Sequence, residues 1–200
     1  VTHWPTPIED LTVVAHSMGG LIARSAVYYA KQKGLDWASR LQNIVFLGTP
    51  HHGAPLEKAG NWLDALLRVT PYSKPFSKLS QVRSAGITDL RYGHVLDDDW
   101  QDLDRFDLHF DQRRVLPLPG DVACFTVAAA MSEKRSTLGN RLIGDGLVPL
   151  HSSLGHHDDA EKILAFDDEA QRIVYRMSHM ELLSSEKVSR QIVRWLRPAG

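Results

Sequence analysis

Short runs of consecutive apolar residues alternate along the chain with segments in which apolar residues recur at helical spacing. Uninterrupted apolar runs are typical of strands in a parallel sheet, because such strands are covered on both faces. Such runs predict strands at Leu11–Ala15, Asn43–Gly48 and Asp121–Ala129. Two later runs, Ile163–Phe166 and Arg172–Tyr175, predict either an edge hairpin or the last strand of the sheet.

Helical spacing predicts two long helices beside these strands. The first covers Met18–Ala30, with apolar side chains at Ile22, Ala26 and Tyr29, and Gly34 ends it. The second closes the chain over Val188–Leu196 and ends before Pro198. A strand, a helix and a second strand in this order form a right-handed βαβ unit, so the predicted fold class is α/β with a mainly parallel sheet.

Composition and charge agree with one ordinary globular domain. The 200 residues are 43% hydrophobic and 24% charged, with a formal net charge of −1. This charge balance favours neither nucleic acid nor an anionic membrane surface as a partner. Cys124, the one cysteine, cannot form a disulfide within the chain, and its apolar neighbours predict a buried, unreactive thiol.

The candidate nucleophile is Ser17, which lies between the first predicted strand and the first predicted helix in the segment LTVVAHSMGGLIAR. Small residues, Ala15 and Gly19, stand two positions before and after it. This pattern predicts a strained strand-to-helix turn that projects the serine hydroxyl outward. We expect Ala15 and Gly19 to approach each other across the turn. The backbone N–H of Met18, at the helix N-terminus, is positioned to bind an oxyanion.

Two motifs resemble the α/β-hydrolase family. The segment A-H-S-M-G-G, which includes His16 and Gly20, resembles its nucleophile elbow, with Ala15 in place of the first glycine of G-x-S-x-G. The segment FLGTPHHG, residues 46–53, resembles the loop after the sixth strand in lipase-type members. The two together are most similar to lipases and to serine esterases of the GPI inositol-deacylase type. The resemblance covers roughly residues 11–55 and 140–196.

The resemblance also implies an acid and a base. Asp145 lies between two glycines and before an apolar Val-Pro run, as in the family's acid loop after the seventh strand. His179 follows the last predicted strand and precedes the last helix, where the family has its base. The order Ser17, Asp145, His179 is that of the α/β-hydrolases. The rivals, which we expect in surface loops or supporting positions, are His16, His151, His156, His157, Asp158 and Asp159.

Other polar groups have less specific interpretations. The neighbouring His51 and His52 predict a loop at a pocket rim and no metal site, because adjacent side chains diverge. Residues 54–119 depart from strand–helix alternation and predict a helical, lid-like insertion, with helices around Trp62–Leu67 and Val82–Leu90. Asp97–Asp99 belongs to an acidic run expected at the surface, and it lacks the spacing of a calcium loop.

The position of Ser17 has a further implication. In the resembled fold about four strands precede the elbow, so we expect this chain to be the C-terminal part of a longer protein. The family's second oxyanion donor lies in a loop of that earlier part, so we expect residues 1–200 alone to be weakly active or inactive. A single cysteine favours the cytoplasm, but the compartment and the oligomeric state stay open.

The resemblance implies a serine hydrolase that cleaves carboxylic esters, such as a lipase or carboxylesterase, through an acyl-enzyme. The substrate would be a small-molecule or lipid ester, and contact with a membrane surface stays open. No cofactor or metal is expected. Three alternatives remain: an acyltransferase with the same triad, a hydrolase-like domain that binds without catalysis, and an amidase or peptidase.

Overall fold

The computed structural model describes residues 4–54, 93, 95–96, 99, 116–133 and 144–197. Its centre is a sheet of four parallel strands in the order β1-β2-β3-β4. The strands are β1 (Leu11–His16), β2 (Leu41–Leu47), β3 (Ala123–Ala130) and β4 (Gln171–Tyr175). The predicted α/β class with a parallel sheet is confirmed.

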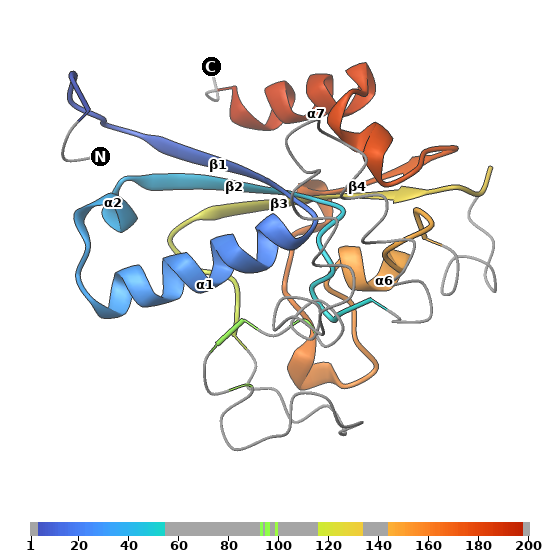
Figure 1. Cartoon of the computed structure of the whole chain (residues 1–200), viewed down its shortest axis with the longest axis horizontal. Helices are drawn as coiled ribbons and strands as arrows, with labels where there is room; N and C mark the ends of the chain where they lie inside the picture. Colours follow the sequence, from blue (N-terminus) through green and yellow to red (C-terminus); the bar gives the residue numbers. More distant parts are fainter. Residues whose placement is uncertain are drawn as a thin grey trace, which may run out of the picture.

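Helices cover both faces of the sheet (Figure 1). The helix α1 (Met18–Gln32) connects β1 to β2 and lies on the same side as α6 (Leu150–Ser153), whereas α7 (Glu186–Leu196) lies on the other side. The other short helices in the described residues are α2 (Asp36–Ser39), η4 (Ala160–Lys162), η5 (Asp168–Ala170) and η6 (Met180–Leu183).

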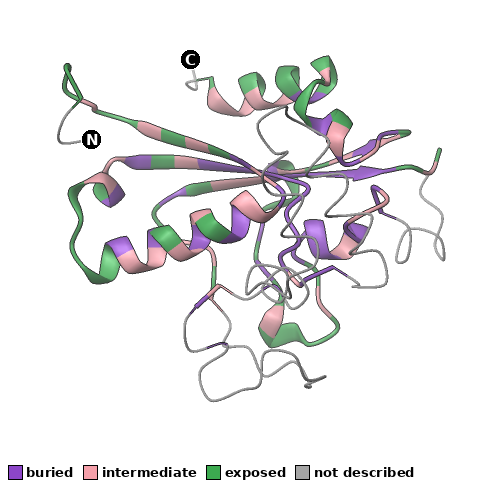
Figure 2. Cartoon of the chain, viewed as in Figure 1, coloured by how far each residue is buried: buried purple, intermediate pink, exposed green. Residues whose placement is uncertain are grey.

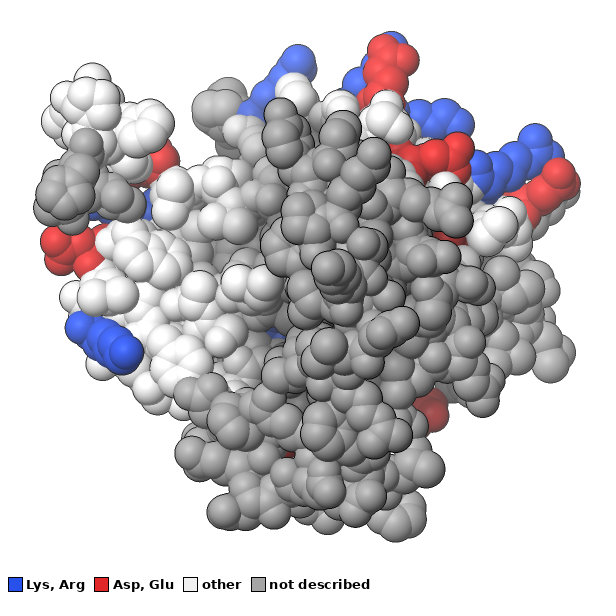
Figure 3. Space-filling view, viewed as in Figure 1, with Lys and Arg blue, Asp and Glu red and all other residues white. Residues whose placement is uncertain are grey.

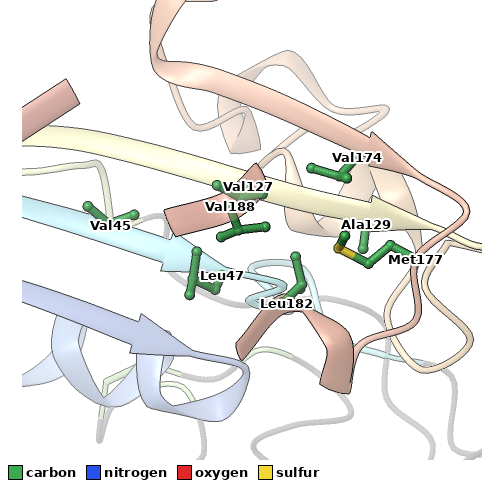
Figure 4. Close-up of a cluster of buried hydrophobic side chains, with 8 residues drawn as sticks. All are labelled: Val45, Leu47, Val127, Ala129, Val174, Met177, Leu182 and Val188. Carbon is green, nitrogen blue, oxygen red and sulfur yellow. The ribbon is translucent and has the colours of Figure 1, made fainter. Parts of the chain in front are cut away.

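Alternate side chains of β2 form the centre of two hydrophobic clusters, one on each face. Ile44 and Phe46 pack on the α1 side with Val27 of that helix. Val45 and Leu47 pack on the other side with Val188 of α7 (Figure 4). Because the two side-chain directions of a strand alternate, burial on both faces requires an uninterrupted apolar run, which in β2 is Ile44–Leu47. Figure 2 shows this end of the strand as buried.

The segment Ile163–Phe166 differs from its predicted hairpin role. It forms no strand, and only Gln171–Tyr175 joins the sheet, parallel to β3. Leu164 and Phe166 are buried in the cluster on the α1 side, and the Leu164 N–H donates to the Gly155 carbonyl. The apolar residues that resemble a strand in sequence therefore cover one face of the sheet without extending it.

The predicted insertion lies mostly outside the described residues, as do both helices expected within it. Asp99 is described, and it corrects the expectation of an acidic surface run at that position. Its side chain is buried, and Oδ2 accepts hydrogen bonds from the N–H groups of Val95 and Leu96. Asp99 therefore stabilises a turn. These two N–H groups explain the buried carboxylate, and no cation is needed to explain it.

The surface shows mixed charge. Along the edge where α7 lies, basic and acidic side chains stand next to one another (Figure 3). Arg190 and Glu186 of this helix form an ion pair. Among the helices in the described ranges, none combines the length and the apolar character needed to cross a bilayer.

Candidate active site

Ser17 occupies a strained turn directly between β1 and α1. Its backbone has φ 58° and ψ −129°, a conformation that is costly for a residue with a Cβ. The Ser17 N–H donates to the Leu47 carbonyl at 2.8 Å, and its own carbonyl accepts from Gly20 N–H at 3.0 Å. These bonds hold the turn, and Met18 follows as the first residue of α1, where helix N–H groups lack intrahelical acceptors.

The serine hydroxyl does not project into open solvent as predicted. Ser17 is only 2% exposed, and its Oγ makes no hydrogen bond within the part of the chain that the structure describes. A buried hydroxyl without a partner is costly unless another group uses it. Hydrogen bonds of catalytic groups are often formed only when a ligand is bound.

The glycine that the packing of the turn requires is Gly20, whereas the sequence pattern pointed to Gly19. A Cβ on Gly19 would have no atom within 4 Å outside its own helix, so this position does not require a glycine for lack of space. The constrained position is Gly20, where a Cβ would lie 2.1 Å from Oγ1 of the buried Thr49. Thr49 follows β2, so Gly20 allows α1 to pack against that loop.

This contrast gives a matched pair of variants. Gly20→Ala is expected to destabilise the protein by about 1–3 kcal/mol, because the added Cβ would overlap the fully buried Thr49 side chain. Gly19→Ala is expected to stay within about 0.5 kcal/mol of the wild type. Urea unfolding of the two variants measures the difference. Thr49→Ala should restore part of the stability lost in Gly20→Ala, because it removes Oγ1 and Cγ2 at 2.1 and 2.5 Å but keeps the Cβ at 2.8 Å. Equal stability of the two alanine variants would contradict the packing described.

Asp145 lies in a tight loop after β3 and is fully enclosed. Its Oδ1 accepts hydrogen bonds from the N–H groups of Leu147 at 3.0 Å and Val148 at 2.8 Å. The preceding Gly144 has φ +47°, and a Cβ there would lie 1.9 Å from the Val148 carbonyl oxygen. The glycine allows the loop to turn tightly, and one carboxylate oxygen stabilises the turn while the other stays available for His179.

His179 lies after β4, immediately before η6, and contacts Asp145 through both its ring and its backbone. The ring Nδ1 donates to Asp145 Oδ2 at 2.6 Å, and the backbone N–H donates to the Asp145 carbonyl at 3.1 Å. His179 is 3% exposed and Asp145 2%. A carboxylate in this position fixes the tautomer that leaves Nε2 as the proton acceptor, and it stabilises the imidazolium form.

Two residues that contact His179 were not predicted to do so. Gly48, which follows β2 with φ +57°, lies so close that a Cβ would be 3.0 Å from His179 Cε1 and Nδ1. His16 was predicted only as a supporting residue of the turn. Its Nε2 lies 3.2 Å from the His179 carbonyl oxygen, and the two rings are 4.6 Å apart. The motif FLGTPHHG drew attention to Gly48 as a glycine in a loop. The contacts of Gly48 and His16 with His179 could not be predicted from one sequence.

The electrostatics keep His16 neutral at ordinary pH. Burial is the main cause that lowers the pKa of His16, and the neighbouring His179 lowers it further, to about 4. The hydrogen bond with the His179 carbonyl and the charge of Asp145 act in the opposite direction but are weaker.

The structure also places the other histidines and the rival aspartates. His156 is exposed and His157 half-buried, as expected for a surface loop, and His151 lies on α6. Asp158 and Asp159 are exposed. The side chains of His51 and His52 diverge as predicted, but His51 is buried at 1% exposure against Phe46 and Phe166, so a pocket rim is wrong for it.

His16 and His51 make stability depend on pH. Burial lowers the pKa of both side chains below the usual value of 6.5, and that of His51 lies well below it. The unfolded chain therefore binds more protons below pH 6.5, so the free energy of unfolding should fall as pH decreases from about 6.5 to 4. Urea unfolding across this range should show that these two histidines take up nearly two protons on unfolding, from the slope of the free energy of unfolding against pH. In His16→Gln the uptake should be about one proton. A flat profile would contradict neutral, buried imidazoles.

The remaining candidate chemistry is limited. Cys124 is half-buried, and burial raises its pKa to about 12, which keeps it a thiol. No group of three or more histidine, cysteine or acidic side chains that could hold a metal ion occurs in the described segments.

The chain is similar to known proteins in sequence and in fold. A family model described as "PGAP1-like alpha/beta domain" matches residues 3–117. The chain is similar in structure to the lipase of Staphylococcus hyicus, with a TM-score of 0.52, 14% identity, and coverage of 96% of this chain and 70% of the lipase. No curated protein matches the sequence.

A second solved structure, the mature lipase BlEst2 of Bacillus licheniformis, matches with a TM-score of 0.49 at 14% identity. The match covers 94% of this chain, which spans 65% of that lipase. Since the family model covers more than half of the chain, the chain belongs to the family of PGAP1-like α/β domains, and its fold is an α/β-hydrolase fold of the lipase and esterase type.

Proposed function

We propose that the protein is a serine hydrolase that cleaves carboxylic esters, with Ser17 as nucleophile, His179 as base and Asp145 as the acid that orients it. The observation that carries the proposal is the buried His179–Asp145 pair, with Nδ1 and Oδ2 2.6 Å apart. The hydrogen bond from His16 holds this pair next to the turn of Ser17.

In the proposed reaction the Ser17 Oγ attacks the ester carbonyl carbon while His179 Nε2 takes the hydroxyl proton. The negative charge that develops on the carbonyl oxygen is stabilised by the Met18 N–H, at the N-terminus of α1. His179 then gives the proton to the departing alkoxide, and the acyl group stays on Ser17. Water, activated by His179, releases the carboxylic acid and regenerates the serine.

Asp145 contributes without exchanging a proton. Its charge stabilises the imidazolium of His179, and its hydrogen bond keeps Nε2 directed away from the carboxylate. The two backbone N–H groups that bind Oδ1 hold the carboxylate in place throughout. The resemblance to lipases in fold supports a lipid ester as the substrate class.

The direct test is product analysis with the protein at its natural full length. Carboxylic esters of increasing acyl length are offered in buffer, and the acid and alcohol products are quantified. Equal amounts of both products support hydrolysis. A second series adds a competing alcohol, and a transferred ester as the main product would instead identify an acyltransferase. Folded protein that releases neither product from any ester would overturn the proposal in favour of a binding domain.

A further inference from the structure

His16 lies where the nucleophile turn meets the loop of the candidate base. It is the last residue of β1 and directly precedes Ser17. Its half-buried side chain reaches His179, 163 positions later in the chain, with Nε2 3.2 Å from the carbonyl oxygen. The two imidazole rings are 4.6 Å apart and tilted by 44°. A residue next to the nucleophile therefore contacts both the backbone and the ring of the candidate base.

The chemistry of this contact defines the state of His16. A carbonyl oxygen only accepts hydrogen bonds, so the His16 Nε2 must carry the proton. Burial and the neighbouring His179 hold the pKa of His16 at about 4, so near neutral pH this is its one ring proton. A neutral ring suits this position, because a second positive charge at 4.6 Å would oppose formation of the His179 imidazolium.

His179 is held by its peptide groups as well as by its ring. The N–H donates to the Asp145 carbonyl, and the carbonyl accepts from His16. The first bond connects His179 to the acid loop, and the second connects it to the turn of Ser17. For proton transfer, a nucleophile and a base must be held to within a fraction of an ångström of their productive separation. The second bond therefore acts on the distance between Ser17 and His179.

We propose that His16 is a positioning residue, which fixes the loop of His179 against the turn of Ser17 through the hydrogen bond from its Nε2 to the His179 carbonyl oxygen. Its effect on turnover rests on the proposed function. Its effect on the position of His179 does not, because the bond exists without substrate.

Two variants separate the hydrogen bond from the ring contact. The amide of His16→Gln can reach the same carbonyl as a donor, whereas His16→Phe keeps an aromatic ring and loses the donor. We expect His16→Phe to lower kcat at least about tenfold with KM changed less than about twofold, since the bond positions the base and not the substrate. His16→Gln should retain at least about a third of the wild-type kcat.

The double variant of His16→Phe with Asp145→Asn gives a second readout. If His16 acts by positioning His179, the two losses of kcat should not multiply, whereas a general loss of stability would not produce this result. In an Asp145→Asn background the base is already misoriented, so His16→Phe should cost less than about threefold there. Wild-type kcat in His16→Phe, an equal loss in His16→Gln, or the same fold-loss in both backgrounds would overturn the proposal.

An NMR measurement distinguishes this proposal from the proposed function. The Nδ1 proton that His179 donates to Asp145 should give a resonance shifted far downfield by its short hydrogen bond. We expect it in the wild type and in His16→Gln, and we expect it shifted or lost in His16→Phe. If the wild type hydrolyses no ester, the proposed function fails, yet this pattern would still support His16 as a positioning residue. An unchanged resonance in His16→Phe would overturn it.

Discussion

Replacing Ser17 with alanine is expected to lower kcat/KM for ester hydrolysis by at least about 10⁴-fold. The variant lacks the Oγ that forms the acyl-enzyme, so only noncovalent stabilisation of the transition state by the site remains. The backbone strain at φ 58° is unaffected, because alanine also has a Cβ. Steady-state kinetics with an activated ester measure the loss.

The matched control for this variant is Ser153→Ala. Ser153 is also buried, and its carbonyl accepts a hydrogen bond from Thr126, a contact that alanine preserves. We expect it to keep activity within about threefold of the wild type. Ester hydrolysis by Ser17→Ala at more than a hundredth of the wild-type rate would contradict Ser17 as the nucleophile.

The second large effect is expected for Asp145→Asn, with kcat lower by about 10³- to 10⁴-fold. The asparagine Oδ1 can still accept from the Leu147 and Val148 N–H groups, so the loop is preserved. Its amide group then donates toward His179 Nδ1, which places the ring proton on Nε2 and removes the base. Activity is measured together with thermal unfolding, because a preserved melting temperature separates a changed tautomer from a collapsed loop.

Asp158→Asn is the control for the loss of one negative charge. Asp158 is exposed and was a rival for the role of the acid. We expect no more than about a twofold change in kcat. A loss in Asp158→Asn as large as that in Asp145→Asn would contradict the assignment.

Local sequence patterns predicted the strand and the helix on either side of Ser17 and the loop that contains Asp145. The apolar run before Ser17 and the helical spacing after it define a strand-to-helix turn, and the structure has that turn with β1 and α1 on either side. The two glycines around Asp145 resemble those of the family's acid loop, and in the structure Gly144 has φ +47° in a tight turn. These features depend on neighbours in sequence, which is why a single sequence contains them.

Contacts between distant segments could not be predicted in this way. The collision that restricts Gly20 involves Thr49, and the space around Gly19 depends on the packing of the whole helix. The partner of His16 lies 163 positions away. Similarly, Leu164 and Phe166 have the pattern of a strand, but packing against the α1 side of the sheet determines their structure.

Assignments that rest on the resemblance stay predictions. The lid-like insertion at 54–119 belongs to this group. The catalytic roles of Ser17, Asp145 and His179 are proposals, supported by the hydrogen bonds that join Asp145, His179 and His16.

The most direct test of the central claim is to label the protein, at its natural full length, with a fluorophosphonate and to locate the adduct by mass spectrometry. We expect one adduct on Ser17, no adduct in Ser17→Ala and much slower labelling in Asp145→Asn, because only an activated serine attacks the phosphorus. An adduct on another serine, or no adduct on folded wild-type protein, would contradict a nucleophile activated by His179 and Asp145.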